Sequence, residues 1–206
     1  MFLEQKNDRQ SCRGWIEVIT GSMFSGKTEE LMRRLRRAVL AKQRVEVYKP
    51  AVDVRYSETD VVSHDANSVS SIAVENANNI LLLAAEADVV GIDEAQFFGP
   101  EVVDVCQKLA AMGVRVIVAG LDMDYLGKPF GSIPQLMAVA EHVSKMHAIC
   151  SRCGNLAQYS HRLVSGGNLV LLGSTEQYEP LCRTCYLATK DAESAMKIDS
   201  EKSVAE

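Results

Sequence analysis

One octapeptide constrains this chain more than any other feature, because residues 21–28 match the pattern G-x-x-x-x-G-K-T. Its members are Gly21, Ser22, Met23, Phe24, Ser25, Gly26, Lys27 and Thr28. In this pattern the glycines let the backbone curl around a phosphate chain, Lys27 brings a positive charge to the outer phosphates, and Thr28 offers a hydroxyl to Mg²⁺. We therefore predict a loop that binds the phosphates of a nucleotide together with Mg²⁺.

The flanks of the octapeptide have the composition that such a loop needs. Residues 15–20 are apolar and β-branched, which predicts a strand. Leu31, Leu35 and Val39 are spaced four apart and predict a helix over residues 27–42. Because a strand, a glycine loop and a helix N-terminus together bind phosphate, a chance match in a Gly-Ser turn is disfavoured.

The rest of the chain alternates between apolar strands and amphipathic helices. We expect strands at 44–48, 69–74, 87–93, 114–119 and 145–149, and helices at 78–86, 100–113 and 133–143. This alternation predicts an α/β fold of the P-loop NTPase (RecA-like) type, with a parallel sheet flanked by helices and right-handed crossovers. Ligands then bind at the carboxyl ends of the strands, where the loops after Thr20, Tyr48, Ile92 and Ala119 meet.

An acidic pair follows a buried-type strand. Asp93 and Glu94 lie directly after the apolar run 87–92, as in a Walker B motif. The aspartate can bind Mg²⁺ and the glutamate can act as a base toward an attacking oxygen. If that oxygen belongs to water the protein is an ATPase, and if it belongs to a bound hydroxyl the protein is a small-molecule kinase. The acidic pair alone leaves both open.

Several aromatic and polar side chains belong to the same loops. Met23 and Phe24, the pair Phe97–Phe98, and Tyr125 with Phe130 can line an apolar slot for a flat heterocycle beside the phosphates. Asp53 and Arg55 follow the second strand and could serve Mg²⁺ and a transferring phosphoryl group, or form a surface ion pair. The basic run at residues 33–37 is interpreted as a solvated helix face or a subunit contact.

Two cysteine pairs form a second signal. Cys150 and Cys153, and Cys182 and Cys185, are C-x-x-C pairs with 28 residues between them. This spacing predicts a structural, tetrahedral four-thiolate Zn²⁺ site rather than disulfides or a redox centre. Cys106 is expected to be a buried helix residue outside the site, and among the histidines only His161 could compete as a ligand.

Composition limits the possible partners and the location. The 206 residues carry a net charge of −5, which makes nucleic acid polymers poor candidates. No apolar run approaches the roughly 20 residues of a membrane span, and the polar N-terminus lacks a signal segment, so we expect a cytoplasmic protein without membrane contact. The expected segments are a flexible arm (1–13), the nucleotide-binding domain (14–149), a zinc-binding module (150–187) and a disordered tail (188–206).

The order of these motifs identifies a family. Met-Phe-Ser-Gly-Lys-Thr at 23–28 is followed by Lys-Pro-x-x-Asp-x-Arg-Tyr at 49–56, Ser-His-Asp at 63–65, Asp-Glu-Ala-Gln-Phe-Phe at 93–98, Gly-Leu-Asp at 120–122, Lys-Pro-Phe-Gly at 128–131 and the cysteine pairs. Over residues 14–187 the chain resembles the cellular, or type II, thymidine kinases. The resemblance implies ATP-dependent phosphorylation of thymidine to dTMP in pyrimidine salvage, with deoxyuridine as a second acceptor. It also implies a homotetramer and feedback inhibition by dTTP.

The resemblance also implies roles for individual residues. Glu94 matches the catalytic base, and Asp53, Arg55, Asp93 and Gln96 match residues near the metal and phosphates. The thymidine pocket is matched by Met23, Phe98, Leu121, Tyr125, Phe130, Ser160, Leu169, Val170, Leu171, Leu172, Gly173 and Tyr178. Ser160 stands where a threonine is usual and Tyr125 where phenylalanine is common.

Two other interpretations remain. A P-loop ATPase with a zinc knuckle that acts on nucleic acid would need a basic groove, which an acidic chain disfavours. A non-catalytic nucleotide-binding or zinc interaction protein would not need the complete set of Lys27, Thr28, Asp93 and Glu94.

Overall fold

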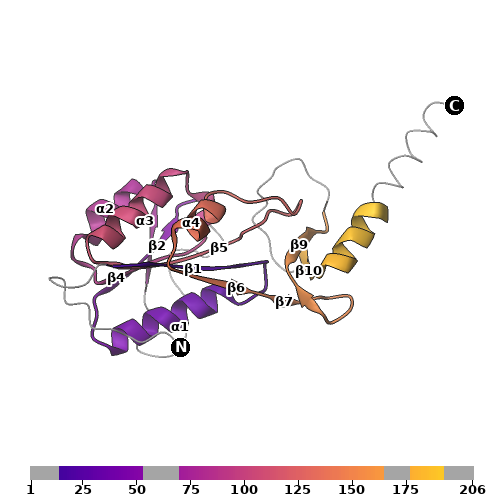
Figure 1. Ribbon diagram of the computed structural model, residues 1–206, viewed down its shortest axis with the longest axis horizontal. Coiled ribbons are helices and arrows are strands. Elements are labelled where there is room, and N and C mark those ends of the chain that lie inside the picture. The colour runs from indigo at the N-terminus through magenta and orange to yellow at the C-terminus, as the bar shows by residue number, and fades with distance from the viewer. Residues whose placement is uncertain (1–13, 53–69, 165–176, 193–206) are drawn as a thin grey trace.

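A parallel sheet of six strands organises the larger part of the molecule (Figure 1). In the computed structural model, which describes residues 14–52, 70–164 and 177–192, the strand order is β3-β2-β4-β5-β1-β6. The strands are β1 (Ile16–Gly21), β2 (Val45–Pro50), β3 (Ser71–Val74), β4 (Val89–Ile92), β5 (Arg115–Gly120) and β6 (His142–Met146). All neighbouring pairs in this sheet are parallel, which confirms the predicted α/β fold.

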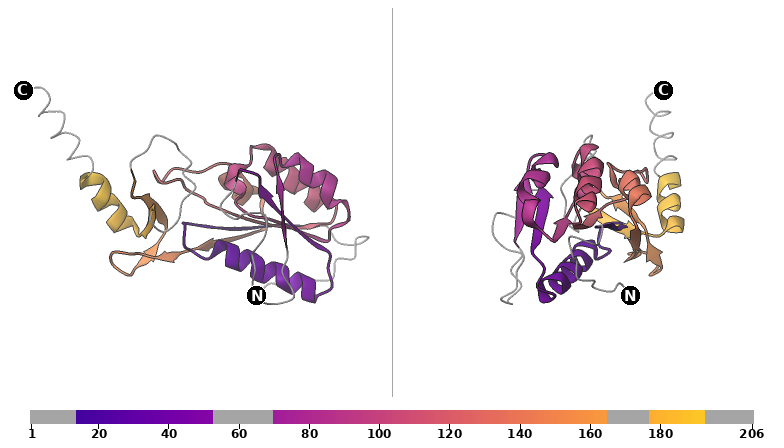
Figure 2. Two further views of the ribbon diagram at one scale, coloured as in Figure 1. Left: turned by 180° about the vertical axis from the view of Figure 1, so that it is seen from behind. Right: turned by 60° about the vertical axis from the view of Figure 1, so that its left-hand side comes forward.

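Helices cover both faces of the sheet, as Figures 1 and 2 show. The helix α1 (Lys27–Leu40) lies on one face, and α2 (Asn78–Leu83), α3 (Glu101–Ala111) and α4 (Ile133–Val139) lie on the other. Short 3₁₀ turns follow α2 at η1 (Ala84–Glu86) and β4 at η2 (Ala95–Phe97). Within the described residues, no helix combines the length and apolarity needed to cross a membrane.

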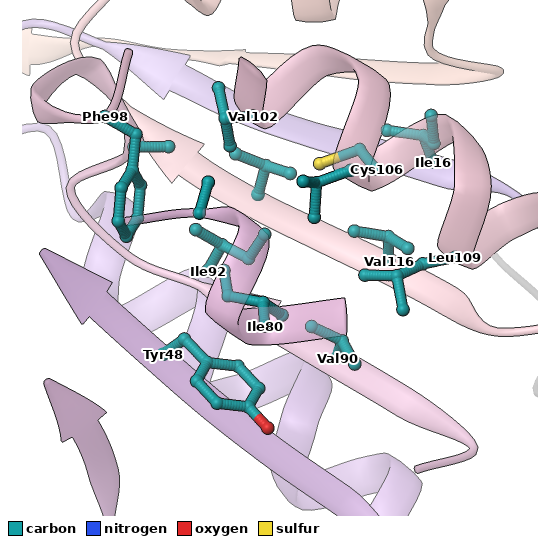
Figure 3. Close-up of a cluster of buried hydrophobic side chains, with 14 of the residues drawn as sticks. Ile16, Tyr48, Ile80, Val90, Ile92, Phe98, Val102, Cys106, Leu109 and Val116 are labelled. Atoms are coloured by element: carbon teal, nitrogen blue, oxygen red, sulfur yellow. The ribbon is translucent and has the colours of Figure 1, made fainter. Parts of the chain in front are cut away.

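Strand periodicity divides the buried side chains between the two faces. In β5, Val116 and Val118 face the three helices, whereas Ile117 packs toward Leu31 and Leu35 of α1. The larger cluster joins the sheet to α2 and α3 through side chains that are almost entirely buried (Figure 3). Its labelled members are Ile16, Tyr48, Ile80, Val90, Ile92, Phe98, Val102, Cys106, Leu109 and Val116. Cys106 is buried as predicted, and burial raises the pKa of its thiol to about 12.

The chain after α4 differs from the prediction. The predicted helix 133–143 is wrong at its end, because α4 stops at Val139 and Ala140 is extended. The next residues form β6, which pairs with β1 so that Glu17 lies opposite His142. The predicted strand 145–149 is correspondingly divided between β6 and β7 (Ala148–Ile149). Hydrogen bonding to β1 decides this, since residues 142–146 alternate in exposure and carry no continuous apolar run.

A buried charge network crosses the start of β1. Glu17 is 0% exposed and accepts hydrogen bonds from Arg34 Nη1 (2.7 Å), Arg115 Nε (2.7 Å) and Trp15 Nε1 (2.8 Å). Burial alone would raise the pKa of Glu17, but the hydrogen bond and charge of Arg115, with Trp15 and Arg34, hold it below its usual value. Arg34 is only 4% exposed, so the predicted solvated basic face is wrong for this residue.

A smaller module lies at the carboxyl end of the sheet (Figure 1). It consists of two antiparallel pairs, β7 with β8 (Leu156–Ala157) and β9 (Tyr159–Arg162) with β10 (Tyr178–Leu181), followed by helical residues 183–192. The helix continues beyond residue 187, the predicted boundary of the module. The module has a small buried cluster made of Ala148, Cys150, Ala157, Tyr159, Leu181, Cys182 and Tyr186.

Candidate active site

The octapeptide forms the connection from β1 to α1, as its flanks predicted. Gly26 has a φ of 80°, a left-handed conformation that favours glycine, and α1 begins at the next residue. Ser25 Oγ and Lys27 Nζ both donate hydrogen bonds to the carbonyl oxygen of Ser22, each at 2.8 Å. These two hydrogen bonds link the end of the loop to its beginning. The N–H groups at the N-terminus of α1 follow directly after the loop, where they can bind a phosphate.

The acidic residue after β4 meets this loop. Thr28 Oγ1 donates a hydrogen bond to Asp93 Oδ2 at 3.2 Å. Burial, and next the charge of Glu94, raise the pKa of Asp93 to about 6, against the lowering effect of Thr28 and Lys27. Adjacent oxygen ligands of an octahedral Mg²⁺ lie about 2.9 Å apart, so this hydroxyl and carboxylate fit a divalent cation. Such a cation would favour the ionised carboxylate.

Glu94 is held in an unusual conformation beside Asp93. Its φ of 50° is rare for a residue other than glycine, and such strain is often found at functional sites. Its N–H donates to Asp93 Oδ1 at 2.9 Å, and its Oε2 accepts a hydrogen bond from Gln96 Nε2. Gln96, 4% exposed, also accepts the N–H of Leu121 at 3.0 Å through its Oε1. The amide of Gln96 thus connects the acidic residue to the loop after β5.

The two phenylalanines after Gln96 have different surroundings. Phe98 is 6% exposed and packs in the core beside Val102 (Figure 3), whereas Phe97 is partly exposed and meets the ring of Phe130 edge-on at 6.0 Å. The structure therefore does not support the placement of Phe98 in the apolar slot. The sequence contains both rings at one site, and only the packing of the 3₁₀ turn η2 distinguishes them.

The smaller module approaches the phosphate loop. The backbone N–H of Met23 donates to Ser160 Oγ of β9 at 2.9 Å, and Ser160 is buried. Tyr178 is buried on β10, opposite Arg162 of β9. The guanidinium of Arg162 lies over the ring of Tyr125 at 4.7 Å. The predicted residues Asp53, Arg55, Leu169, Val170, Leu171, Leu172 and Gly173 lie outside the described residues.

The four predicted cysteines come together. The Sγ atoms of Cys150, Cys153, Cys182 and Cys185 all lie within 4.8 Å of one another, and Cys153 and Cys182 approach to 3.5 Å. Sulfur ligands of a tetrahedral Zn²⁺ lie about 3.8 Å apart, so the cluster fits a metal of this type. Burial opposes ionisation of Cys150, but backbone N–H groups lower the pKa of its thiol to about 6, whereas hydrogen bonds with the neighbouring thiols raise the pKa of Cys185 to about 12. The fit to a metal therefore rests on the positions of the four sulfur atoms.

The matching family model is described as thymidine kinase and covers residues 14–186. This chain belongs to the thymidine kinase family. A thymidine kinase of Bacteroides fragilis is 59% identical over 98% of this chain and 99% of its own length. Thymidine kinases of Porphyromonas gingivalis and of a Rhodothermus species are 62% and 64% identical, each over 84% of this chain and over 85% and 81% of their own lengths.

Family membership decides between the interpretations that the acidic pair left open. The chain belongs to a family of kinases, so the group that receives the phosphoryl is a bound hydroxyl rather than water. The ATPase that acts on nucleic acid and the non-catalytic binding protein are correspondingly disfavoured.

Proposed function

We propose that this protein transfers the γ-phosphoryl group of ATP to the 5′-hydroxyl of thymidine. The observation that carries the proposal is the arrangement around Gln96, which holds Glu94 with one end of its amide and the loop of Leu121 with the other. A candidate base and a candidate acceptor loop are thereby joined beside the Asp93–Thr28 pair. The names of the relatives at 59–64% identity support thymidine as the acceptor.

In the proposed reaction the protein mainly positions and stabilises charge. The backbone of residues 21–26 and Lys27 hold the phosphates. Thr28 and Asp93 would hold Mg²⁺, which would offset the charge of the phosphate oxygens. The 5′-oxygen bonds to the γ-phosphorus while the bond to the β–γ bridging oxygen breaks, and ADP leaves with that electron pair. Glu94 orients the hydroxyl and accepts its proton.

The proposed acceptor pocket differs from the sequence prediction at one position. We assign Phe97 rather than Phe98, because Phe97 meets Phe130 and Phe98 lies in the core. The other proposed pocket residues are Met23, Leu121, Tyr125, Phe130, Ser160, Tyr178 and residues 169–173. Asp53 and Arg55 stay predictions for the phosphates and Mg²⁺.

The finer properties implied by the resemblance belong to the same proposal. We propose Zn²⁺ as the metal of the four-cysteine cluster, since four thiolates suit a structural zinc site. Deoxyuridine as a second acceptor, dTTP as a feedback inhibitor, a homotetramer and a cytoplasmic location also remain predictions.

The test measures thymidine-dependent ADP release with ATP and Mg²⁺. Replacing Glu94 by glutamine keeps the side-chain size and removes the base, so kcat should fall by roughly 10²- to 10⁴-fold while ATP affinity changes little. Glu86→Gln is the matched control. The side chain of Glu86 is 83% exposed, and the residue precedes β4, at the amino end of the sheet and away from the site. The proposal fails if wild type releases no ADP in response to thymidine, or if Glu94→Gln matches wild type. ADP release that needs DNA instead of thymidine would support the ATPase.

A further inference from the structure

The loop after β5 is a compact turn organised by Asp124. One carboxylate oxygen, Oδ1, accepts the N–H groups of Leu126 and Lys128, both at 2.9 Å. The backbone adds hydrogen bonds from the N–H of Asp124 to the oxygen of Lys128 and from the N–H of Phe130 to the oxygen of Asp122. Residues 121–130, which we name the acceptor turn, are thus held together internally. Leu121 and Phe130 lie at its two ends.

One side chain of the smaller module, which contains the four cysteines, reaches the tip of the acceptor turn. The hydroxyl of Tyr186 donates to the carbonyl oxygen of Tyr125 at 3.1 Å. Met123 packs against the buried cluster of the module, and the guanidinium of Arg162 covers the ring of Tyr125. The acceptor turn therefore rests on the module, and the Tyr186 hydroxyl makes a direct polar contact to its backbone.

The four-cysteine cluster sets the position of Tyr186. This residue follows Cys185 directly, and its N–H donates to the oxygen of Cys182 at 2.9 Å. Its ring is 5% exposed and stacks on Tyr159, with ring centroids 4.2 Å apart and planes inclined by 9°. A metal bound to Cys182 and Cys185 would fix the start of the helix 183–192, and with it the direction of the phenol.

A packing role alone would not account for the hydroxyl. A phenylalanine at position 186 would keep the stacked ring. The hydroxyl, however, donates its hydrogen bond to the main chain of the acceptor turn, outside the module. We propose that Tyr186 is a positioning residue that holds the acceptor turn through the backbone of Tyr125. It thereby couples metal binding at the four cysteines to acceptor binding. This inference rests on the proposed function.

The coupling is reciprocal, since two sites linked by a free energy must affect each other equally. Acceptor binding should therefore raise the affinity for the metal, so that at equilibrium a chelator removes less of it. A hydroxyl-to-carbonyl hydrogen bond is worth enough to change affinity by roughly three- to tenfold. Loss of this hydrogen bond should weaken binding of the acceptor and leave binding of ATP unchanged. The reason is that Tyr186 contacts the acceptor turn and not residues 21–28 through this bond.

The experiment compares Tyr186→Phe with Tyr159→Phe. Each variant removes one hydroxyl from the same stacked pair, but only the first removes the bond to Tyr125. Zinc content is measured by elemental analysis, KM for thymidine and for ATP by ADP release, and zinc loss to a chelator by a colorimetric dye with and without thymidine.

We expect both variants to keep one zinc per chain. Tyr186→Phe should raise KM for thymidine by roughly three- to tenfold, leave KM for ATP within about twofold, and weaken the protection of zinc by thymidine. Tyr159→Phe should behave as wild type in all three measurements. Equal effects of the two variants, equal changes in both KM values, or undiminished protection in Tyr186→Phe would overturn the inference. Wild type without thymidine-dependent turnover would overturn the proposed function instead.

Discussion

The buried carboxylate of Glu17 offers a quantitative test of how the fold is stabilised. Glutamine has nearly the same size, so Glu17→Gln removes a charge without creating a cavity. The carboxylate that Arg34 and Arg115 both approach at 2.7 Å is then lost. Both guanidiniums lie at side-chain exposures of 5% or less, where water cannot replace the missing anion.

Removing one partner of a buried ion pair typically costs about 3–5 kcal/mol of folding free energy, because it leaves buried charge uncompensated. Arg34 keeps its ion pair with Glu30 at 2.8 Å, so we expect a cost near the lower end of this range. That is a large share of the roughly 5–15 kcal/mol that stabilises a domain. At about 2–4 °C per kcal/mol for a chain of this size, the melting temperature should fall by roughly 10 °C.

The assay is urea denaturation at pH 7, followed by the same comparison in acid. The folded-state pKa of Glu17 lies below its usual 4.5, so its stabilising effect is complete above that value and is lost as the pH falls through the folded pKa. Glutamine does not titrate. The difference in unfolding free energy between the two proteins should therefore shrink as the pH is lowered below 4.5.

Arg44→Gln is the control, since Arg44 is exposed and pairs with Asp88 and Glu86 at the surface. Exposed pairs contribute little, so its urea midpoint should stay near that of wild type. If Glu17→Gln unfolds at the wild-type midpoint, or the difference between the two proteins does not change with pH, the buried network does not stabilise the fold as argued.

Two further predictions concern a glycine and a cysteine. Gly131 and Gly154 both have positive φ (53° and 74°), but a Cβ at 131 would lie 2.4 Å from the Gln96 carbonyl oxygen and one at 154 meets nothing within 4 Å. Gly131→Ala should therefore lower the urea midpoint and raise KM for thymidine more than Gly154→Ala, and equal effects would contradict the steric argument. Cys182→Ser should reduce zinc from one per chain to near zero by elemental analysis, while Cys106→Ser keeps it; no zinc in wild type would refute the site.

Much of the site could be predicted because its signals are local in the chain. The phosphate loop is a contiguous motif between a strand and a helix, and each cysteine pair is a contiguous C-x-x-C. Asp93 and Glu94 follow an apolar run whose buried-strand character is visible without a structure. In each case spacing along the backbone already specifies which chemical groups come together, so the α/β fold and its nucleotide loop followed from the residues alone.

Other features depend on partners that are distant in sequence, and these only the tertiary structure decided. The end of α4 depended on hydrogen bonding of β6 to β1, and the burial of Arg34 on a glutamate in another element. The choice between Phe97 and Phe98 depended on which ring the core could accept. The bond from Tyr186 to Tyr125 joins residues 61 apart. Sequence determines which groups are available, and packing determines which of them meet, because burial and hydrogen bonding are settled only when all the elements come together.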